Sequence, residues 1–200
     1  MAVNIRPAVP EDAETAAKLT FMAYHVFSYD IFGKIGEEAA HKHFEGLWKH
    51  GYNRFGYKFS YIANKDNNTV GLITCYPGQM ITKLVLPTLR QLIYLGRGRF
   101  IFHFLTHLNN FYHFASSQET NEDEFYIATL SVLPEHRNMG IGAELLKFAN
   151  VLAAKQDLQK CSLHVNAKNT DGIRFYEKNG FSKAKPFDKN ATYFRMVHSV

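Results

Sequence analysis

The segment PEHRNMGIGAELL, residues 134–146, constrains the fold more than any other part of the chain. The residues before it, EFYIATLSVL, have the composition of a β-strand, and those after its two glycines favour a helix. A helix start leaves N–H groups unpaired, and the peptide dipoles add partial positive charge there. Because Gly140 and Gly142 lack side chains, an anion can approach the backbone closely. The segment therefore predicts an anion-binding turn between a strand and a helix.

Two common nucleotide-binding loops do not fit this turn. A nucleoside triphosphate loop of the Walker A type needs Lys and then Ser or Thr after its last glycine, but Ala143 and Glu144 stand there. The dinucleotide pattern GxGxxG needs a third glycine where this chain has Leu145. Two interpretations stay open from these residues alone. The turn either binds another phosphate-bearing ligand or is a tight structural turn without one.

The composition narrows the class of protein. Two hundred residues with 46% hydrophobic content can bury one substantial core, which favours a single domain over residues 1–200. The formal net charge of +5 favours an anionic partner. Lys and Arg are spread along the chain instead of forming a basic arm, so a polyanionic small molecule is expected and nucleic acid is not.

The cysteines and the N-terminus indicate a cytoplasmic protein. Cys75 and Cys161 lie far apart in apparent strands, which gives neither a disulfide framework nor a CxxC metal pair. Two buried free thiols are typical of a reducing compartment. The first residues lack the apolar core of a signal peptide. The uncharged segment Phe100–Gln118 contains too many His, Asn, Thr, Ser and Gln residues to cross a membrane.

The periodicity of apolar residues predicts a mixed α/β domain. The expected strands cover residues 3–9, 58–64, 69–76, 124–133, 161–167 and 191–199. The expected helices begin near Pro10, near Glu37, just after the glycine turn, and at Thr170. The second is expected to end at about His50 and the third at about Lys155, each with apolar residues at helical spacing along one side. We expect Thr170 to cap the last of these helices and Gly180 to end it. The turn KDNN at residues 65–68 predicts a hairpin.

Residues 77–123 are too long for a hairpin connection, so they are expected to form a helical insertion between the third and fourth strands. We expect two helices, about Met80–Leu95 and Phe100–Ser117, joined at the residues GRG. The phenylalanines of RFIFHF are expected to fill a groove beside the acceptor site, as a lid or wall, with a membrane surface or a homodimer interface as alternatives. His103 and His107 have the spacing of a metal pair but no third ligand in the helix, so no metal is expected.

The turn and its flanks resemble the GNAT superfamily of acyl-CoA-dependent N-acetyltransferases. The first set of matching residues surrounds the glycine turn and comprises Leu130, Val132, Pro134, Glu135, Arg137, Gly140, Ile141, Gly142 and Leu146. The second set follows at the expected distance and comprises Asn169, Gly172, Phe175, Tyr176, Gly180 and Phe181. The resemblance implies a mixed, mostly antiparallel sheet flanked by helices.

The resemblance also implies roles for the matched positions. Backbone N–H groups of the turn are expected to bind the coenzyme A pyrophosphate, from residues Arg137, Asn138, Met139, Gly140, Ile141, Gly142 and Ala143. The strand end Leu130, Ser131 and Val132 is expected to pair with the pantetheine arm, with the N–H of Val132 polarising the thioester carbonyl. Asn169 is expected to hydrogen-bond the cofactor. Tyr176 is expected to protonate the departing thiolate.

The general base is open. Many members of the superfamily have a glutamate six residues before the position of Val132, where this chain has Tyr126. Glu124 has the same strand parity and is a candidate base acting through a water. His164 is a second candidate, with an unperturbed pKa of ~6.5.

The function that the resemblance implies is transfer of an acetyl or other short acyl group from acetyl-CoA to a primary amine. The amine, on a small molecule or a protein, is expected to attack directly in a ternary complex, without a metal. The alternative is an acyl-CoA-binding sensor or interaction domain without activity. The missing glutamate at Tyr126 favours that alternative, and the retained Tyr176 favours the enzyme.

Overall fold

The fold is known from a computed structural model that describes residues 3–32, 35–106, 120–184 and 192–200. In this part of the chain the sheet has seven strands in the order β1-β2-β3-β4-β5-β7-β6. The strands are β1 (Asn4–Pro7), β2 (Ser60–Lys65), β3 (Asn68–Pro77), β4 (Phe125–Val132), β5 (Lys160–Asn166), β6 (Ser182–Lys183) and β7 (Tyr193–Ser199). Neighbouring strands run antiparallel except β4 and β5, which are parallel. The predicted mixed, mostly antiparallel sheet is confirmed.

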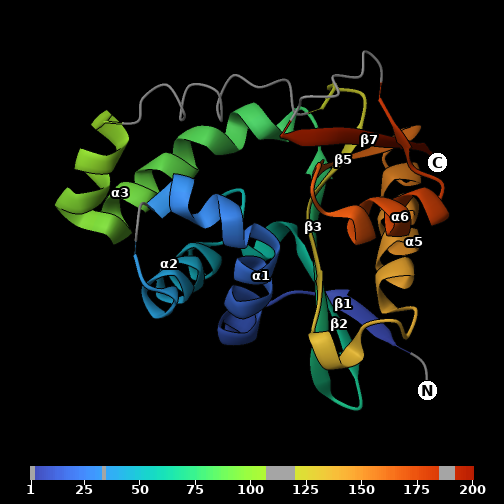
Figure 1. Ribbon diagram of the computed structural model, residues 1–200, viewed down its shortest axis with the longest axis horizontal. Helices are drawn as coiled ribbons and strands as arrows, with labels where there is room; N and C mark the ends of the chain where they lie inside the picture. Colours follow the sequence, from blue (N-terminus) through green and yellow to red (C-terminus); the bar gives the residue numbers. More distant parts are fainter. Residues whose placement is uncertain (1–2, 33–34, 107–119, 185–191) are drawn as a thin grey trace.

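Helices cover both faces of the sheet (Figure 1). Their bounds are α1 (Ala13–Phe32), α2 (Glu37–His50), α3 (Met80–Thr106), α5 (Ile141–Ala154) and α6 (Thr170–Lys178). Helices α1, α2 and α3 lie on one side, here named the α1 face, and α5 and α6 lie on the other, the α5 face. The predicted helix over Glu37–His50 is confirmed, because its residues Ala40, Phe44, Leu47 and Trp48 are all buried.

Alternation along the strands builds a separate core on each face. On β4, Phe125 and Ile127 join the apolar cluster under α5, which includes Leu145 and Leu146 of that helix. Tyr126 points the other way and packs with residues of α3. On β5 and β7, and on β4 as far as Ile127, alternation alone therefore assigns a residue to one face.

Strand β4 contains a bulge at Ala128. Its register with β3 pairs Ile127 with Cys75 and Thr129 with Thr74, so Ala128 has no partner position. A bulge bends its strand and increases the local twist. The parallel pairing of β4 with β5 ends at the same place, since its last pair is Ile127 with Leu163. From Ala128 onwards the strand edge that faces β5 therefore has no ladder partner among the described residues.

Two predictions about element boundaries were wrong, and one short strand was not predicted. The helix break expected at GRG does not occur, because α3 continues from Met80 to Thr106 through Pro87 and both glycines. The last residues of the second expected helix, 107–117, lie outside the described residues. The N-cap of α6 is Asn169 instead of Thr170, since its side chain accepts a hydrogen bond from the Gly172 N–H. The short strand β6 was not predicted, because two residues carry too little pattern.

Candidate active site

The glycine turn forms an exposed, left-handed loop between β4 and α5. Asn138 and Gly140 both have positive φ, 60° and 81°, and Gly140 is the N-cap of α5 without any side-chain cap. The first helical hydrogen bond in α5 runs from the Glu144 N–H to the Gly140 carbonyl (3.1 Å). The N–H groups of the three residues between them precede the helical ladder and are thus available to a ligand. This geometry suits an anion.

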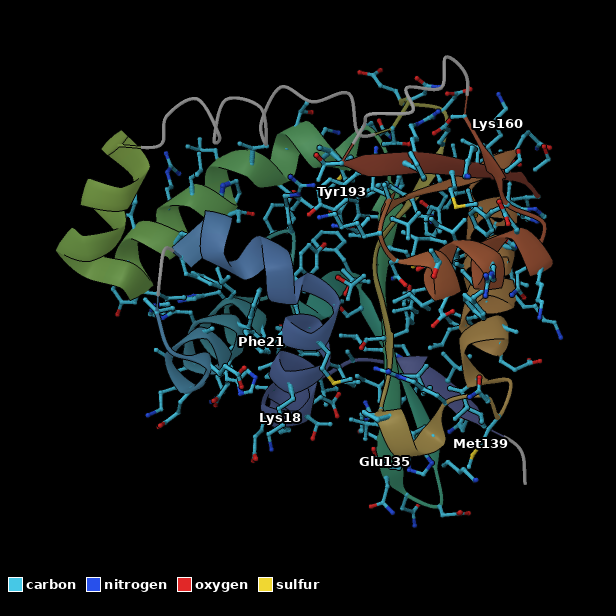
Figure 2. The ribbon with its side chains drawn as sticks, viewed as in Figure 1. Lys18, Phe21, Glu135, Met139, Lys160 and Tyr193 are labelled. Carbon is cyan, nitrogen blue, oxygen red and sulfur yellow. The ribbon has the colours of Figure 1, made fainter. Side chains whose placement is uncertain are left out.

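The side chains of the turn do not fill the space above it. Arg137, Asn138 and Met139 are exposed, whereas Ile141 points into the core. The Arg137 side chain turns back, and its Nε donates to the Val132 carbonyl (3.1 Å) at the end of β4. Met139 lies at the same end of the molecule as the β2–β3 hairpin (Figure 2). The arginine therefore links the strand end to the turn and leaves the backbone accessible.

Gly142 has a packing role that the sequence did not predict. A Cβ added there would lie 2.9 Å from Cζ of Phe175 in α6. The missing side chain therefore lets α6 approach the first turn of α5. A substitution such as Gly142→Val would disturb this packing, so it cannot isolate ligand approach. Gly140 is the opposite case, because no heavy atom lies within 4 Å of its added Cβ.

Asn169 and Gly172 form one capping unit at the start of α6. The Asn169 Oδ1 accepts from the Gly172 N–H (2.9 Å), and a Cβ on Gly172 would lie 2.6 Å from the Asn169 Nδ2. The carbonyl end of the Asn169 amide is thus engaged within the helix. Its Nδ2 is the end that can donate to a ligand, so the predicted contact of Asn169 with the cofactor stays a prediction restricted to that atom.

Tyr176 lies on α6, one residue after Phe175, and its ring contacts Phe175 and Phe181. It packs against the same cluster as Leu130 and Val132, so α6 brings it to the side of the sheet where the β4 edge is free. Burial raises the pKa of the Tyr176 hydroxyl to about 12. The hydroxyl is therefore protonated throughout the neutral range, as a proton or hydrogen-bond donor must be.

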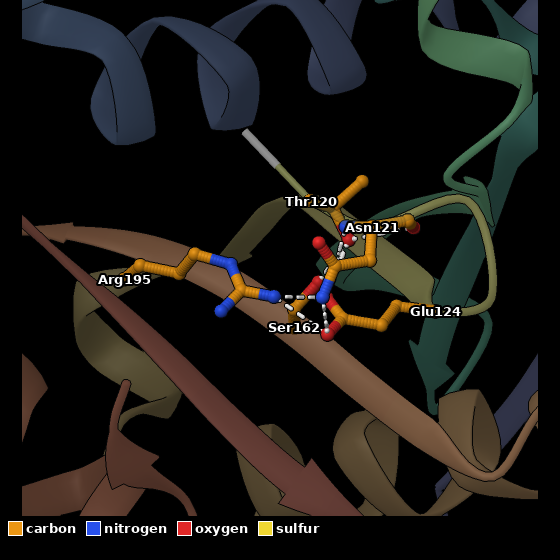
Figure 3. A network of polar contacts seen from close by, with 5 residues as sticks. All are labelled: Thr120, Asn121, Glu124, Ser162 and Arg195. Atoms are coloured by element: carbon orange, nitrogen blue, oxygen red, sulfur yellow. Dashed lines mark hydrogen bonds and ion pairs between the residues drawn. The ribbon is translucent and has the colours of Figure 1, made fainter. Parts of the chain in front are cut away.

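Glu124 is the centre of a buried polar network just before β4 (Figure 3). Its carboxylate is 1% exposed and receives hydrogen bonds from Arg195 Nη2 (2.6 Å), Thr120 Oγ1 (2.7 Å) and Asn121 Nδ2 (3.0 Å). The hydroxyl of Ser162 on β5 lies 2.5 Å from that of Thr120. The network joins the segment entering β4 to β5 and β7, so it fixes three neighbouring strands.

The network does not favour Glu124 as a general base. Burial alone would raise the pKa of Glu124, but hydrogen bonds from Arg195, Thr120 and Ser162 and the charge of Arg195 outweigh it and lower the pKa to about 2. A carboxylate with such a low pKa is a weak proton acceptor at neutral pH. Its oxygens are also occupied by the contacts named above, which leaves little room for a bridging water.

Known proteins resemble this chain in sequence family and in fold. The model of the acetyltransferase (GNAT) family matches residues 27–181. The chain belongs to the GNAT acetyltransferase family. Among solved structures, an N-acetyltransferase from Staphylococcus aureus Mu50 has a TM-score of 0.74 at 21% identity, with 97% of this chain and 99% of that chain covered.

Two further solved structures of similar fold contain ligands. The PaiA N-acetyltransferase from Thermoplasma acidophilum, in complex with coenzyme A, has a TM-score of 0.57 at 18% identity over 100% of both chains. Arabidopsis thaliana Naa50, in complex with the bisubstrate analogue CoA-Ac-MVNAL, has a TM-score of 0.55 at 18% identity, again over 100% of both chains. At these low sequence identities, the similarity shows a shared fold only.

His164 lies on the α1 face of this GNAT sheet, in the strand that parts from β4. It alternates with Leu163 and Val165, which are both in the cluster of the α5 face. Its ring centroid lies 6.1 Å from that of Tyr126, and its backbone is in register with Arg195. The structure thus brings His164 and Tyr126 together at the place where β4 and β5 diverge, although the two residues are not neighbours in the sequence.

The cysteines do not suit a covalent role. Both thiols are free and buried. Burial raises the pKa of Cys75, and it raises that of Cys161 to about 12. Neither is therefore a thiolate at neutral pH.

The described ranges contain neither a cluster of metal ligands nor a membrane-spanning helix. No group of three His, Cys, Asp or Glu side chains that could hold a metal ion occurs among them. No helix within those ranges is long and apolar enough to span a membrane. The backbone of His103 lies in α3, whereas His107 is outside the described residues.

Two residues near the site were not predicted from the sequence. Arg195 stands in the apolar strand YFRMVHS, and a lone charge in such a strand is a signal for a buried partner. Tyr24 of α1 donates a hydrogen bond to the Ala128 carbonyl (2.6 Å). No local pattern connects residues 104 positions apart.

Proposed function

We propose that this GNAT chain is an N-acetyltransferase that moves an acetyl or other short acyl group from acetyl-CoA to a primary amine. One observation carries the proposal. The free edge of β4 after Ala128 is followed, across residues 133–140, by the uncapped N-terminus of α5. A strand edge suits the amide groups of pantetheine, and a helix N-terminus suits a pyrophosphate.

The edge of β4 and the start of α5 would bind different parts of the cofactor. The backbone of Leu130, Ser131 and Val132 would pair with the pantetheine arm, and an N–H at the strand end would polarise the thioester carbonyl. The N–H groups from Arg137 to Ala143 would bind the pyrophosphate, with those of Ile141, Gly142 and Ala143 preceding the helical ladder. Asn169 would donate to the cofactor through Nδ2. Coenzyme A in the structure of the PaiA relative is consistent with this assignment.

The reaction is direct attack by the amine. An acceptor amine with the pKa of a free lysine, ~10.4, is almost entirely protonated at neutral pH, so it must lose a proton before it attacks. A C–N bond then forms, the C–S bond breaks, and the thiolate takes up a proton in exchange for the one that the nitrogen loses as the amide forms. With its pKa at about 12, Tyr176 is a weaker acid than a thiol, so its main contribution is a hydrogen bond to the developing thiolate.

We propose His164 as the base in preference to Glu124. An imidazole has an unperturbed pKa of ~6.5, which suits proton removal at neutral pH. His164 lies beside Tyr126 on the α1 face, which α1 and α3 cover. Glu124 instead forms an ion pair with Arg195.

The position of the site indicates the side from which the acceptor approaches. The proposed acceptor is any primary amine, on a small molecule or a protein. The acceptor would approach from the α1 face, opposite the glycine turn. Naa50 was solved with a bisubstrate analogue that carries a peptide sequence, so a protein amine is one acceptor class to test beside small amines. We further propose one catalytic domain over residues 1–200 with an insertion at 77–123, in the cytoplasm, where the two buried thiols stay reduced.

A non-catalytic acyl-CoA-binding domain is the second candidate. Tyr126 occupies the place where many family members have a glutamate, and the nearest carboxylate, Glu124, is held by Arg195. Both observations favour binding without transfer if His164 is not a base.

One experiment separates the two functions. Acetyl-CoA binding is measured by calorimetry, and thiol release is measured with a panel of small amines, lysine peptides and peptides with free N-termini. The enzyme predicts thiol release that an acceptor stimulates and that His164→Gln reduces. Binding of acetyl-CoA without stimulated release across the panel would instead establish the sensor.

A further inference from the structure

The hydroxyl of Tyr24 contacts the point where β4 leaves its regular pairing. Ala128 is the bulged residue, and its carbonyl accepts a hydrogen bond from the Tyr24 hydroxyl at 2.6 Å. The pairing of β4 with β5 ends one residue earlier, at Ile127. A single side chain of α1 is thus bonded to the backbone at the start of the free strand edge.

The ring of Tyr24 is itself held in place. Its centroid lies 5.3 Å from that of Phe55 in an edge-to-face arrangement and 6.3 Å from that of Phe44. Phe55 and Phe44 are 3% and 1% exposed. Such contacts restrict a ring to one orientation, so the hydroxyl has a fixed position relative to the bulge.

The hydrogen bond orients a whole peptide unit. The carbonyl of Ala128 and the N–H of Thr129 belong to one planar trans peptide, in which they point in opposite directions. By fixing the carbonyl toward α1, Tyr24 also fixes the direction of the Thr129 N–H. The Thr129 side chain is 3% exposed, and its hydroxyl has no hydrogen-bond partner within the described ranges, so the side chain does not supply this restraint.

We propose that Tyr24 is a positioning residue for acyl transfer, which holds the bulge peptide of β4 in the orientation that aligns the acyl thioester with the acceptor. This role rests on the proposed function, because it requires the thioester to lie along the edge of β4. It links the two faces of the sheet, since Tyr24 comes from the acceptor side and the strand edge binds the donor. Tyr24 itself need not touch either substrate.

The test compares Tyr24→Phe with Tyr94→Phe. The first variant keeps the ring and its contacts with Phe44 and Phe55, so it is expected to fold. The second removes a hydroxyl from a side chain on α3 that is 73% exposed. We expect Tyr24→Phe to lower kcat by about tenfold, as for loss of one well-placed hydrogen bond, with unchanged affinity for coenzyme A. Tyr94→Phe should match the wild type.

A spectroscopic readout separates positioning from general stability. The carbonyl stretch of bound acetyl-CoA, labelled with ¹³C in the acetyl group, is measured by difference infrared spectroscopy. Positioning predicts that the band shifts toward its frequency in water in Tyr24→Phe but not in Tyr94→Phe. An active wild type with the same kcat and the same band in Tyr24→Phe would overturn this proposal alone. A wild type that neither binds nor turns over acetyl-CoA would overturn the proposed function as well.

Discussion

The two faces of the sheet meet at β4 but are built in different ways. On the α5 face the candidate donor site consists mainly of main-chain groups within a short stretch, from the bulge at Ala128 to the first turn of α5, and α6 adds the side chains of Asn169 and Tyr176. On the α1 face the polar groups are side chains from distant segments, such as Glu124 and Arg195, 71 residues apart. A site made of backbone depends on a local conformation, whereas a site made of side chains depends on the whole topology.

The largest expected effect concerns the α1 face. Arg195→Met leaves the Glu124 carboxylate buried without its cation, which we expect to lower the free energy of unfolding by about 3–5 kcal/mol. Urea denaturation at pH 7 measures this change. The control Arg174→Met removes one partner of an exposed pair, Arg174 with Asp171 at 3.9 Å, and should change stability by less than about 1 kcal/mol. Equal effects of the two substitutions would contradict the assigned importance of the network.

The same network predicts a pH dependence. Because the pKa of Glu124 is lowered from 4.5 to about 2 on folding, its contribution is complete above the unfolded pKa and is lost as pH falls through the folded one. Wild type should therefore lose about 3 kcal/mol relative to Glu124→Gln between pH 5 and pH 2. Urea denaturation of both proteins across this range gives the difference. A difference that does not vary with pH would show that Glu124 titrates alike in both states.

The third expected effect concerns catalysis at the donor site. Tyr176→Phe should lower kcat by about a hundredfold with an acceptor from the amine panel, because the developing thiolate loses its hydrogen-bond donor. The affinity for acetyl-CoA should change little. Tyr61→Phe is the matched control, since burial also raises the pKa of that tyrosine while its ring packs against Phe148. Full turnover in Tyr176→Phe would remove this residue from the mechanism.

The smallest expected effect comes from a substitution that changes the backbone strain of the turn alone. At Gly140, φ is 81° and no atom lies near the added Cβ, so Gly140→Ala adds backbone strain without a steric clash. We expect coenzyme A to bind about tenfold more weakly, as for a strain of roughly 1–2 kcal/mol. Gly36→Ala is the control, because Gly36 also has open space but a negative φ of −67°. Calorimetry with coenzyme A checks both variants, and equal affinities would contradict the assigned role of the turn.

The donor side could be predicted because its signals are local. The strand, the turn and the helix start of residues 124–155 follow each other directly, and helical spacing identified the buried side of α5. The sequence did not reveal every role of the individual residues in this stretch. Gly142 is predicted to allow a ligand to approach the backbone, and its missing side chain also makes room for Phe175, which lies 33 positions later.

The α1 face could be predicted only in outline. The helix over Glu37–His50 was found from its apolar stripe, but the partner of Glu124 was not, because pairing across β4, β5 and β7 depends on strand order. The prediction of a helix break at GRG, within α3, was also wrong. Glycine costs only about 1 kcal/mol in a helix interior, so flanking turns can carry the helix through.

The central claim is that coenzyme A binds along the free edge of β4 and at the start of α5. Hydrogen–deuterium exchange of the backbone amides, with and without saturating coenzyme A, tests it most directly. If coenzyme A binds there, we expect new protection concentrated at residues 128–132 and at Ile141, Gly142 and Ala143, with little change in α1 and α2. Protection that appears elsewhere, or binding that leaves these amides as exposed as before, would contradict it.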